Sequence, residues 1–187
     1  MRIIYLTSGH EIKNGKGTGA ISQFGDEAVE ARKFVTALAK ELWSKYKIMA
    51  YTDNDSWTLS GVITWVGSKV KSSDYTIDVH FNASANEAAN GAEVLISNTH
   101  TPKEKLFATK IVNEIASTLS IKNRGVKTEA DSQHSKLGIL SNHKLSSANN
   151  ILIEICFISN RNDMKLYFFN FNELITNLAK TINENIN

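Results

Sequence analysis

Short apolar segments alternate with longer amphipathic ones along most of the chain, and this alternation constrains the fold more than any other feature. The short segments are rich in Ile, Val or Tyr and are bounded by polar residues or glycine, which is typical of strands. They predict strands over residues 2–7, 48–52, 75–81, 92–97 and 150–158. The first, third and last of these are nearly continuous in apolar character, as are strands that helices cover on both faces.

Helices are predicted between these strands from the spacing of apolar residues and from capping signals. Asp26 is a candidate cap for a helix over 27–45, and Ser56 is one for a second helix whose apolar face extends to residue 70. The segment from Thr101 to Glu104 has the form of a capping box with proline at the first helical position. The last helix is predicted over residues 172–185.

Strands that alternate with helices indicate an α/β fold. We therefore expect a twisted, mostly parallel sheet of about six strands with helices on both faces. A length of 187 residues suits one domain, so residues 1–187 are predicted to form a single domain. Two long stretches, 8–25 and 122–149, show no regular pattern, and loops of this length are usually functional or mobile.

The charged residues nearly balance, with 21 Lys and Arg against 19 Asp and Glu and a formal charge of +2. This excludes a strongly electrostatic nucleic-acid binder, in which excess Lys and Arg would cluster. The single cysteine, Cys156, excludes an intramolecular disulfide framework and a cysteine-rich zinc site. A metal site would therefore use His, Asp and Glu, and the five histidines leave that option open.

The first ten residues lack the apolar core and the cleavage site of a secretory signal. No apolar run approaches the roughly 18–20 residues that a membrane span needs. We expect synthesis in the cytoplasm without a signal peptide, and no insertion into a membrane. If the protein acts outside the membrane, something else must release it from the cytoplasm.

Ionisable residues occur where predicted strands end, and this is the edge at which α/β sheets build their sites. His10 follows the first strand, His80 ends the third, and Glu154 interrupts the apolar run of the last. Glu27 lies in the first turn of the first helix. Two histidines and one carboxylate form a known catalytic zinc set, and a further carboxylate can take a proton from water.

Each of these residues also has a simpler explanation. His10 would be an exposed loop histidine, His80 a hydrogen-bonded residue at a strand end, and Glu27 a favourable charge at a helix N-terminus. Glu154 is the hardest to explain without a site, because an unpaired buried carboxylate is costly. The spacing alone leaves both interpretations open.

Four blocks of the chain also follow a known pattern. Ser8-Gly9-His10 has a Gly-His motif after the first strand, and Glu27 is followed by a helix and then Tyr51-Thr52. Residues 78–83 contain His-x-Asn-Ala, and residues 151–160 contain Glu-x-x-Phe-hydrophobic-Ser-Asn. Together these blocks resemble the amidase-3 family of zinc-dependent N-acetylmuramoyl-L-alanine amidases, over residues 2–185.

The resemblance implies that His10, Glu27 and His80 are ligands of Zn2+. It implies that Glu154 is the catalytic general base and acid. The implied reaction is hydrolysis of the amide bond between N-acetylmuramic acid and L-alanine in peptidoglycan.

Two residues are candidates for substrate binding. Asn82 lies two residues after His80 and so shares its face of the strand. Arg124 would pair with a carboxylate of the peptide stem. Both also have ordinary structural explanations, as a strand-end cap and as a solvated loop cation.

Other polar residues are weaker candidates for the site. Glu11 and Glu30 are rival carboxylates for the metal, because the first directly follows one predicted ligand and the second lies one helical turn after another. His134 and His143 are predicted to be surface residues of the stretch 122–149. Cys156 is predicted to be a core residue, since no histidine is specified to activate it.

The resemblance and the absent signal together favour a phage or prophage lysin. Residues 1–187 would be a single catalytic amidase domain, and we expect it to be a monomer that acts on the cell wall, in the periplasm or outside, after its release. Peptidoglycan is the expected partner, not nucleic acid. The alternatives are a non-catalytic peptidoglycan-binding or regulatory module on the same fold, and another zinc peptidase of the cell wall.

Overall fold

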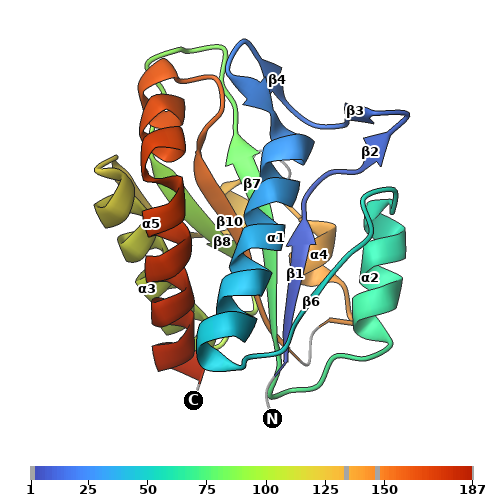
Figure 1. The fold of residues 1–187 in the computed structure, drawn as a ribbon. Coiled ribbons are helices and arrows are strands. Elements are labelled where there is room, and N and C mark those ends of the chain that lie inside the picture. Colours follow the sequence, from blue (N-terminus) through green and yellow to red (C-terminus); the bar gives the residue numbers. More distant parts are fainter. Residues whose placement is uncertain (1–2, 133–134, 146–147, 187) are drawn as a thin grey trace.

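A six-stranded sheet lies between two layers of helices in the computed structural model, which describes residues 3–132, 135–145 and 148–186 (Figure 1). The strands of this sheet are β1 (Ile4–Ser8), β6 (Ala50–Thr52), β7 (Tyr75–Asn82), β8 (Ala92–Ile96), β9 (Asn123–Thr128) and β10 (Asn149–Phe157). Their order is β6-β1-β7-β10-β8-β9. The prediction of a single α/β domain with a mostly parallel sheet of six strands is confirmed.

Two strands of the sheet run against the other four. Strands β6, β1, β7 and β10 pair in parallel, whereas β8 is antiparallel to β10 and β9 is parallel to β8. Glu154 on β10 is in register with His80 on β7 and with Glu93 near the start of β8. The first residues of β8 and β9 therefore lie at the same edge of the sheet as the last residues of β1 and β7.

Helices cover both faces of the sheet, as predicted (Figure 1). Ile4 and Leu6 belong to the core that packs under one helical layer, and Tyr5 between them belongs to the core under the other. Successive side chains of a strand point to opposite faces, so one short strand contributes to both cores. The first layer holds α1 (Glu27–Tyr46), α3 (Pro102–Leu119) and α5 (Arg161–Ile186), and the second holds α2 (Leu59–Gly67) and α4 (Gly138–Ser141).

Two of the predicted helix starts are confirmed by their capping bonds. The Asp26 side chain accepts a hydrogen bond from the backbone N–H of Val29 at the start of α1. At the start of α3, the Thr101 hydroxyl accepts from the N–H of Glu104 at 3.1 Å, and the Glu104 carboxylate accepts from the N–H of Thr101 at 2.6 Å. These side chains satisfy backbone donors that have no partner within the helix.

Two other helix boundaries differ from the prediction. Helix α2 is capped by Thr58 rather than Ser56, because the Thr58 hydroxyl accepts from the N–H of Gly61. Helix α5 begins at residue 161, eleven residues before the predicted start. Its first turns leave Phe168 and Phe169 exposed, so their apolar residues do not follow the spacing of one buried face.

The stretch 8–25 is more regular than its sequence indicates. It contains two small hairpins, β2 (Ile12–Lys13) with β3 (Lys16–Gly17) and β4 (Ile21–Ser22) with β5 (Gly25–Asp26). Asn14 and Gly15 have φ values of 52° and 74°, which is the conformation that a tight Asn-Gly hairpin turn requires. This turn closes the first hairpin, whose first strand begins four residues after the end of β1.

The prediction that 122–149 is irregular is wrong for much of its length. The segment contains the edge strand β9, the short helix η1 (Glu129–Asp131) and α4. Strand β9 has the sequence NRGVKT, and edge strands of this kind lack the apolar run by which buried strands are found. His143 is exposed as predicted, and His134 lies outside the described residues.

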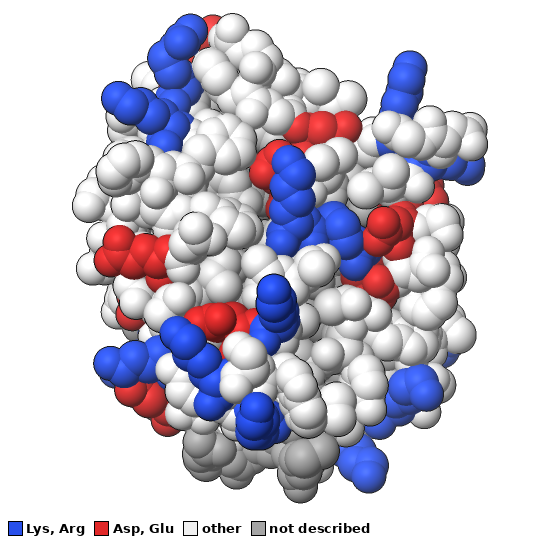
Figure 2. Space-filling view, viewed as in Figure 1, with Lys and Arg blue, Asp and Glu red and all other residues white. Residues whose placement is uncertain are grey.

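The surface carries charges of both signs. On the face formed by α1, α3 and α5, Lys and Arg are interspersed with Asp and Glu (Figure 2). Within the described ranges, no helix has the length and apolar character that crossing a membrane requires.

Candidate metal centre

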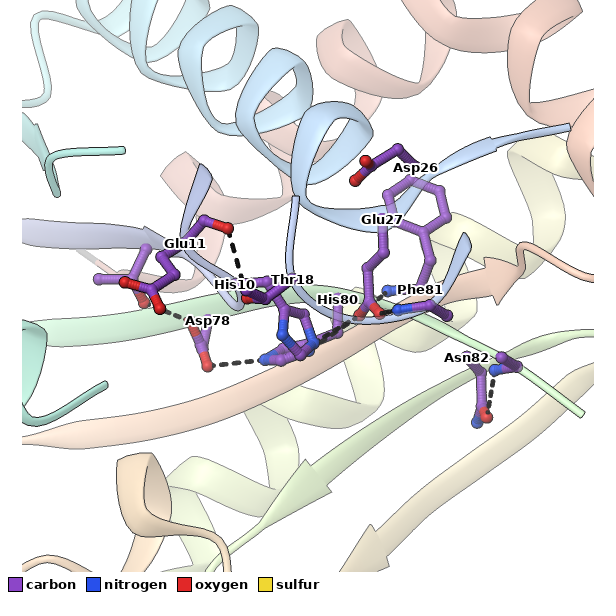
Figure 3. Close-up of polar contacts among 12 residues, drawn as sticks. His10, Glu11, Thr18, Asp26, Glu27, Asp78, His80, Phe81 and Asn82 are labelled. Carbon is purple, nitrogen blue, oxygen red and sulfur yellow. Dashed lines mark hydrogen bonds and ion pairs between the residues drawn. The ribbon is translucent and has the colours of Figure 1, made fainter. Parts of the chain in front are cut away.

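Three of the predicted site residues meet at the edge where β1 and β7 end. His10 comes from the loop after β1, Glu27 is the first residue of α1, and His80 lies near the end of β7 (Figure 3). One ligand atom from each lies within 4.8 Å of the other two. Residues that are 70 positions apart in sequence are therefore placed together by the parallel pairing of β1 with β7.

The Glu27 carboxylate is the centre of this cluster. Its Oε1 lies 3.1 Å from His80 Nδ1 and 3.3 Å from His10 Nε2, and it accepts a hydrogen bond from the N–H of Phe81. Its Oε2 accepts from the N–H of Ala20 at 2.8 Å. Burial raises the pKa of Glu27, but hydrogen bonds from both histidines and their charges outweigh it and hold the pKa well below its usual range. The cluster is thus built around an ionised carboxylate.

Asp78 orients the imidazole of His80, and sequence reasoning assigned it no function. Asp78 Oδ2 lies 3.0 Å from His80 Nε2, and Oδ1 accepts a hydrogen bond from the Thr7 hydroxyl at 2.5 Å. With the Nε2 proton directed at Asp78, Nδ1 faces Glu27 and is the atom available to a metal. Asp78 lies two residues before His80 on the same strand, so the two-residue period was the signal that could have found it.

The pKa of His80 reflects the carboxylates around it. Burial lowers the pKa, but Asp78, Glu27 and Glu154 together outweigh burial and raise it well above its usual value. A metal ion at this cluster would replace the proton that this surplus of negative charge attracts.

Two glycines let the backbone approach the cluster closely. A Cβ atom at Gly9 would overlap the His80 ring. At Gly19, where φ is +98°, a Cβ would lie 2.6 Å from the His10 ring and 2.8 Å from Glu27 Oε2. The backbone of the stretch 8–25 therefore packs directly against the cluster and holds the two imidazoles next to the carboxylate.

The rival carboxylates lie outside the cluster in the part of the chain that the structure describes. Glu11 borders the neighbouring cleft, but it is not among the three residues whose ligand atoms converge. Glu30 forms an ion pair with Lys33, in which Oε1 lies 2.7 Å from Nζ. Of the carboxylates near the start of α1, Glu27 is the one that meets both histidines.

Glu154 lies beside the cluster on β10, in register with His80. Its Oε2 is buried and has no hydrogen-bond partner among the described residues. Burial, strengthened by the negative charges of Glu27, Glu93 and Asp78, raises the pKa of Glu154 to about 8, although the charge of His80 acts in the opposite direction. A buried carboxyl with a free oxygen and a pKa near neutrality is suited to accept and donate protons.

A cleft of about 700 Å³ runs along this edge and includes all six predicted site residues in its lining. Asn82 donates from Nδ2 to Glu93 Oε1 at 3.0 Å. Arg124 donates from Nε to Glu93 Oε2 at 2.6 Å, and its guanidinium lies over the Phe157 ring. Both candidates for substrate binding therefore contact the same buried carboxylate.

Glu93 was missed because it lies at the start of a strand. The rule that sites form at the carboxyl ends of strands assumes a parallel sheet, and β8 runs in the opposite direction. Nothing in the segment 92–97 signals this reversal, so the sequence offered no way to place Glu93 beside Glu154.

The donor set fits a metal ion of the zinc type. Two imidazole nitrogens and one carboxylate are a known ligand set of catalytic zinc, and a carboxylate that orients a ligating histidine usually accompanies it. The fold and this cluster together define an α/β protein with a candidate metal centre of the hydrolase type, placed in an open cleft next to a carboxyl group.

The sequence comparison gives the family. Residues 4–187 match the family model described as Amidase_3, N-acetylmuramoyl-L-alanine amidase. Since the match covers nearly the whole chain, the chain belongs to this family. A curated relative, the uncharacterized protein CPE1502 of Clostridium perfringens (strain 13 / Type A), is 28% identical over 186 residues, which are 97% of this chain and 51% of the relative. The chain thus spans about half the length of that relative.

Solved structures share the fold. The catalytic domain of the CD27L endolysin, which targets Clostridia Difficile, is 26% identical with a TM-score of 0.72, and the match covers 100% of this chain and 97% of that one. Cwp6 from Clostridium difficile is 24% identical with a TM-score of 0.75, over 99% of this chain and 28% of that chain. The catalytic domain of CwlV, an N-acetylmuramoyl-L-alanine amidase from Bacillus (Paenibacillus) polymyxa var. colistinus, is 18% identical with a TM-score of 0.74, over 100% and 96%.

Proposed function

We propose that this protein is a zinc-dependent amidase that hydrolyses the bond between N-acetylmuramic acid and L-alanine in peptidoglycan. The observation that carries the proposal is the convergence of His10, Glu27 and His80 beside Glu154, whose Oε2 is buried without a partner among the described residues. Family membership supplies the reaction and the substrate class. Residues 1–187 would form one catalytic domain.

His10, Glu27 and His80 would hold the zinc ion. When bound, zinc supplies Lewis-acid chemistry, in which a carbonyl group is polarised and a water molecule becomes easier to deprotonate. Asp78 keeps the His80 ring in the orientation that the ligand set needs. The proposal is supported by the donor types, by their mutual distances and by the close approach of Gly9 and Gly19.

Glu154 would be the general base and then the general acid. It accepts the proton of the attacking water and delivers it to the alanine nitrogen as the C–N bond of the amide breaks. The products are a free lactyl carboxylate on the sugar and a free amino group on L-alanine. Asn82 and Arg124, which line the same cleft, would contact the substrate.

A role as a phage or prophage lysin is supported by the likeness to the CD27L endolysin catalytic domain. In this proposal a monomer acts on the cell wall after release from the cytoplasm. Its partner is peptidoglycan, and it neither binds nucleic acid nor inserts into a membrane.

The test is to incubate the purified protein with intact muropeptides, with and without a metal chelator, and to identify new amino termini by mass spectrometry. We expect zinc-dependent release of peptides that begin with L-alanine. Cleavage elsewhere in the stem would instead indicate a zinc peptidase of the cell wall. Binding of muropeptides without any cleavage would indicate a non-catalytic module.

The Glu154→Gln variant separates the roles of the metal ligands from that of the base. We expect it to keep its zinc, as measured by elemental analysis, and to lose about 100- to 10,000-fold in turnover. The His80→Ala variant should lose both zinc and activity. Near-normal activity of Glu154→Gln would contradict the assignment of the base.

A further inference from the structure

Two cations on β9 lie close to the buried Glu93 carboxylate, and neither takes part in the proposed proton transfer. Arg124 and Lys127 are both on β9, and their side chains are 26% and 30% exposed. Arg124 Nε and Lys127 Nζ each lie 2.6 Å from Glu93 Oε2. Both residues line the same cleft as His10, His80 and Glu154.

Glu93 holds these cations in place. Its side chain is only 8% exposed, and besides the two cations it accepts a hydrogen bond from Asn82 Nδ2 at 3.0 Å. Burial raises the pKa of Glu93, but the bonds from Lys127 and Arg124 outweigh burial and leave its pKa below the usual value. One ionised carboxylate therefore fixes two cations, while Asp131 and Asp163 also interact electrostatically with Lys127 and Arg124 respectively.

Both cations keep N–H donors that are available to a ligand. Arg124 offers five N–H groups and Lys127 three, and only part of these are used by Glu93 and the carbonyl of Asn90. Asp131 also lines the cleft, but its carboxylate is exposed and accepts from the N–H and the hydroxyl of Thr128. Arg124 and Lys127 line the cleft and therefore offer their remaining N–H donors to a ligand there.

The spacing of the sheet relates this group to the metal centre. His80, Glu154 and Glu93 are in register on three adjacent strands. Neighbouring strands lie about 4.8 Å apart, so Glu93 lies about 10 Å across the sheet from His80. An extended peptide covers that distance with about three residues.

We propose that Arg124 and Lys127, positioned by Glu93, bind a free carboxylate on the second or third residue of the peptide stem. The proposal rests on the amidase function, because that reaction places the scissile amide at the metal centre. The carboxyl of muramic acid is consumed in that amide, so the free carboxylates near it lie on the peptide side. The group thereby selects stems with a free carboxylate over stems that are amidated at that position.

The experiment uses two pairs of N-acetylmuramoyl tripeptides. In one pair the second residue carries either a free carboxylate or a carboxamide, and in the other pair the third residue does. Their Kd values are measured by calorimetry on the full-length Glu154→Ala protein, which binds without turnover. We expect the acid to bind about 10-fold or more tightly than the amide in one of the pairs, and this preference should shrink with added salt.

Matched variants test whether the cations cause this preference. Lys127→Met, made in the same Glu154→Ala protein, should reduce the acid-to-amide ratio to near one because it removes one of the two cationic donors. Lys127→Arg should retain the preference, and so should Lys110→Met on the exposed side of α3. If Lys127→Met does not fold, Lys127→Gln serves the same purpose.

Equal Kd values for acid and amide in both pairs would overturn the proposal, and so would an equal loss of affinity for both forms in Lys127→Met. Failure of the amidase function is recognised separately, by the absence of cleavage when the zinc-loaded wild-type protein is given the same tripeptides. A preference for the acid in the binding experiment would stand even in that case.

Discussion

Asp78 contacts the His80 ring through Nε2, and we expect this contact to strengthen metal binding at the proposed site. We expect Asp78→Asn to lower zinc affinity by about 10- to 100-fold, because an amide supports the ligating imidazole less well than a carboxylate. Competition with a zinc-binding dye measures the change. The control is Asp74→Asn, which removes a buried carboxylate just before the other end of β7, where it accepts from the N–H groups of Ile3 and Lys71. That variant should lose stability and keep its zinc affinity, and equal losses of affinity in both variants would contradict the role of Asp78.

The Gly9→Ala variant tests whether the close approach of the backbone to His80 is needed at the same site. A methyl group at this position would overlap the His80 ring, so Gly9→Ala should displace the ring and reduce both zinc content and activity. Gly61→Ala is the matched substitution, since its nearest neighbour atom lies 3.6 Å away and the residue is inside α2. It should be neutral for zinc and stabilising by up to about 1 kcal/mol. Normal zinc content in Gly9→Ala would show that His80 has room to move.

Helix α3 is joined to the sheet through its capping box. Glu104 accepts from the N–H of Thr101 and also from the N–H of Asn150 at the start of β10. Thr101→Ala should therefore cost about 1 kcal/mol of unfolding free energy, the usual value of a cap. Glu104→Ala should cost about 1–3 kcal/mol more, because it leaves a buried N–H without a partner.

Urea denaturation monitored by circular dichroism compares these two variants. Thr109→Ala is the control, since its exposed hydroxyl bonds only to the Lys105 carbonyl within the helix. Its effect should stay within about 0.5 kcal/mol. If Glu104→Ala costs no more than Thr101→Ala, the bond from α3 to β10 contributes little to stability.

At the scale of the whole molecule, we expect binding of the proposed zinc ion to stabilise the folded state. The proposed ligands come from a loop, a helix and a strand, so zinc would bind the folded chain and not the unfolded one. At a zinc concentration 1,000 times Kd the gain is about 4 kcal/mol, which corresponds to about 8–16 °C in Tm for a chain of this size. A thermal melt with and without chelator measures the shift, and His10→Ala, which lacks a ligand, should show almost none.

Much of the sheet could be predicted because its buried strands are marked by apolar runs. Strands β1, β7, β8 and β10 overlap the predicted segments, and α1 and α3 begin where their capping residues indicate. Strand β9 was not predicted, because an edge strand that contains Arg, Gly and Lys has no such apolar run. The start of α5 was not predicted either, because the exposed Phe168 and Phe169 obscure the apolar spacing of its buried face.

The sequence by itself determined the fold class, and its resemblance to a known family predicted His10, Glu27 and His80 as the residues that meet at the sheet edge. Periodicity gives the elements, and the rule for parallel strands places His10 and His80 at one edge. Only the tertiary structure decided the direction of β8 and β9, which brings Glu93, Arg124 and Lys127 to that same edge. The physical reason is that strand direction depends on pairing between distant segments. No local pattern of side chains records that pairing.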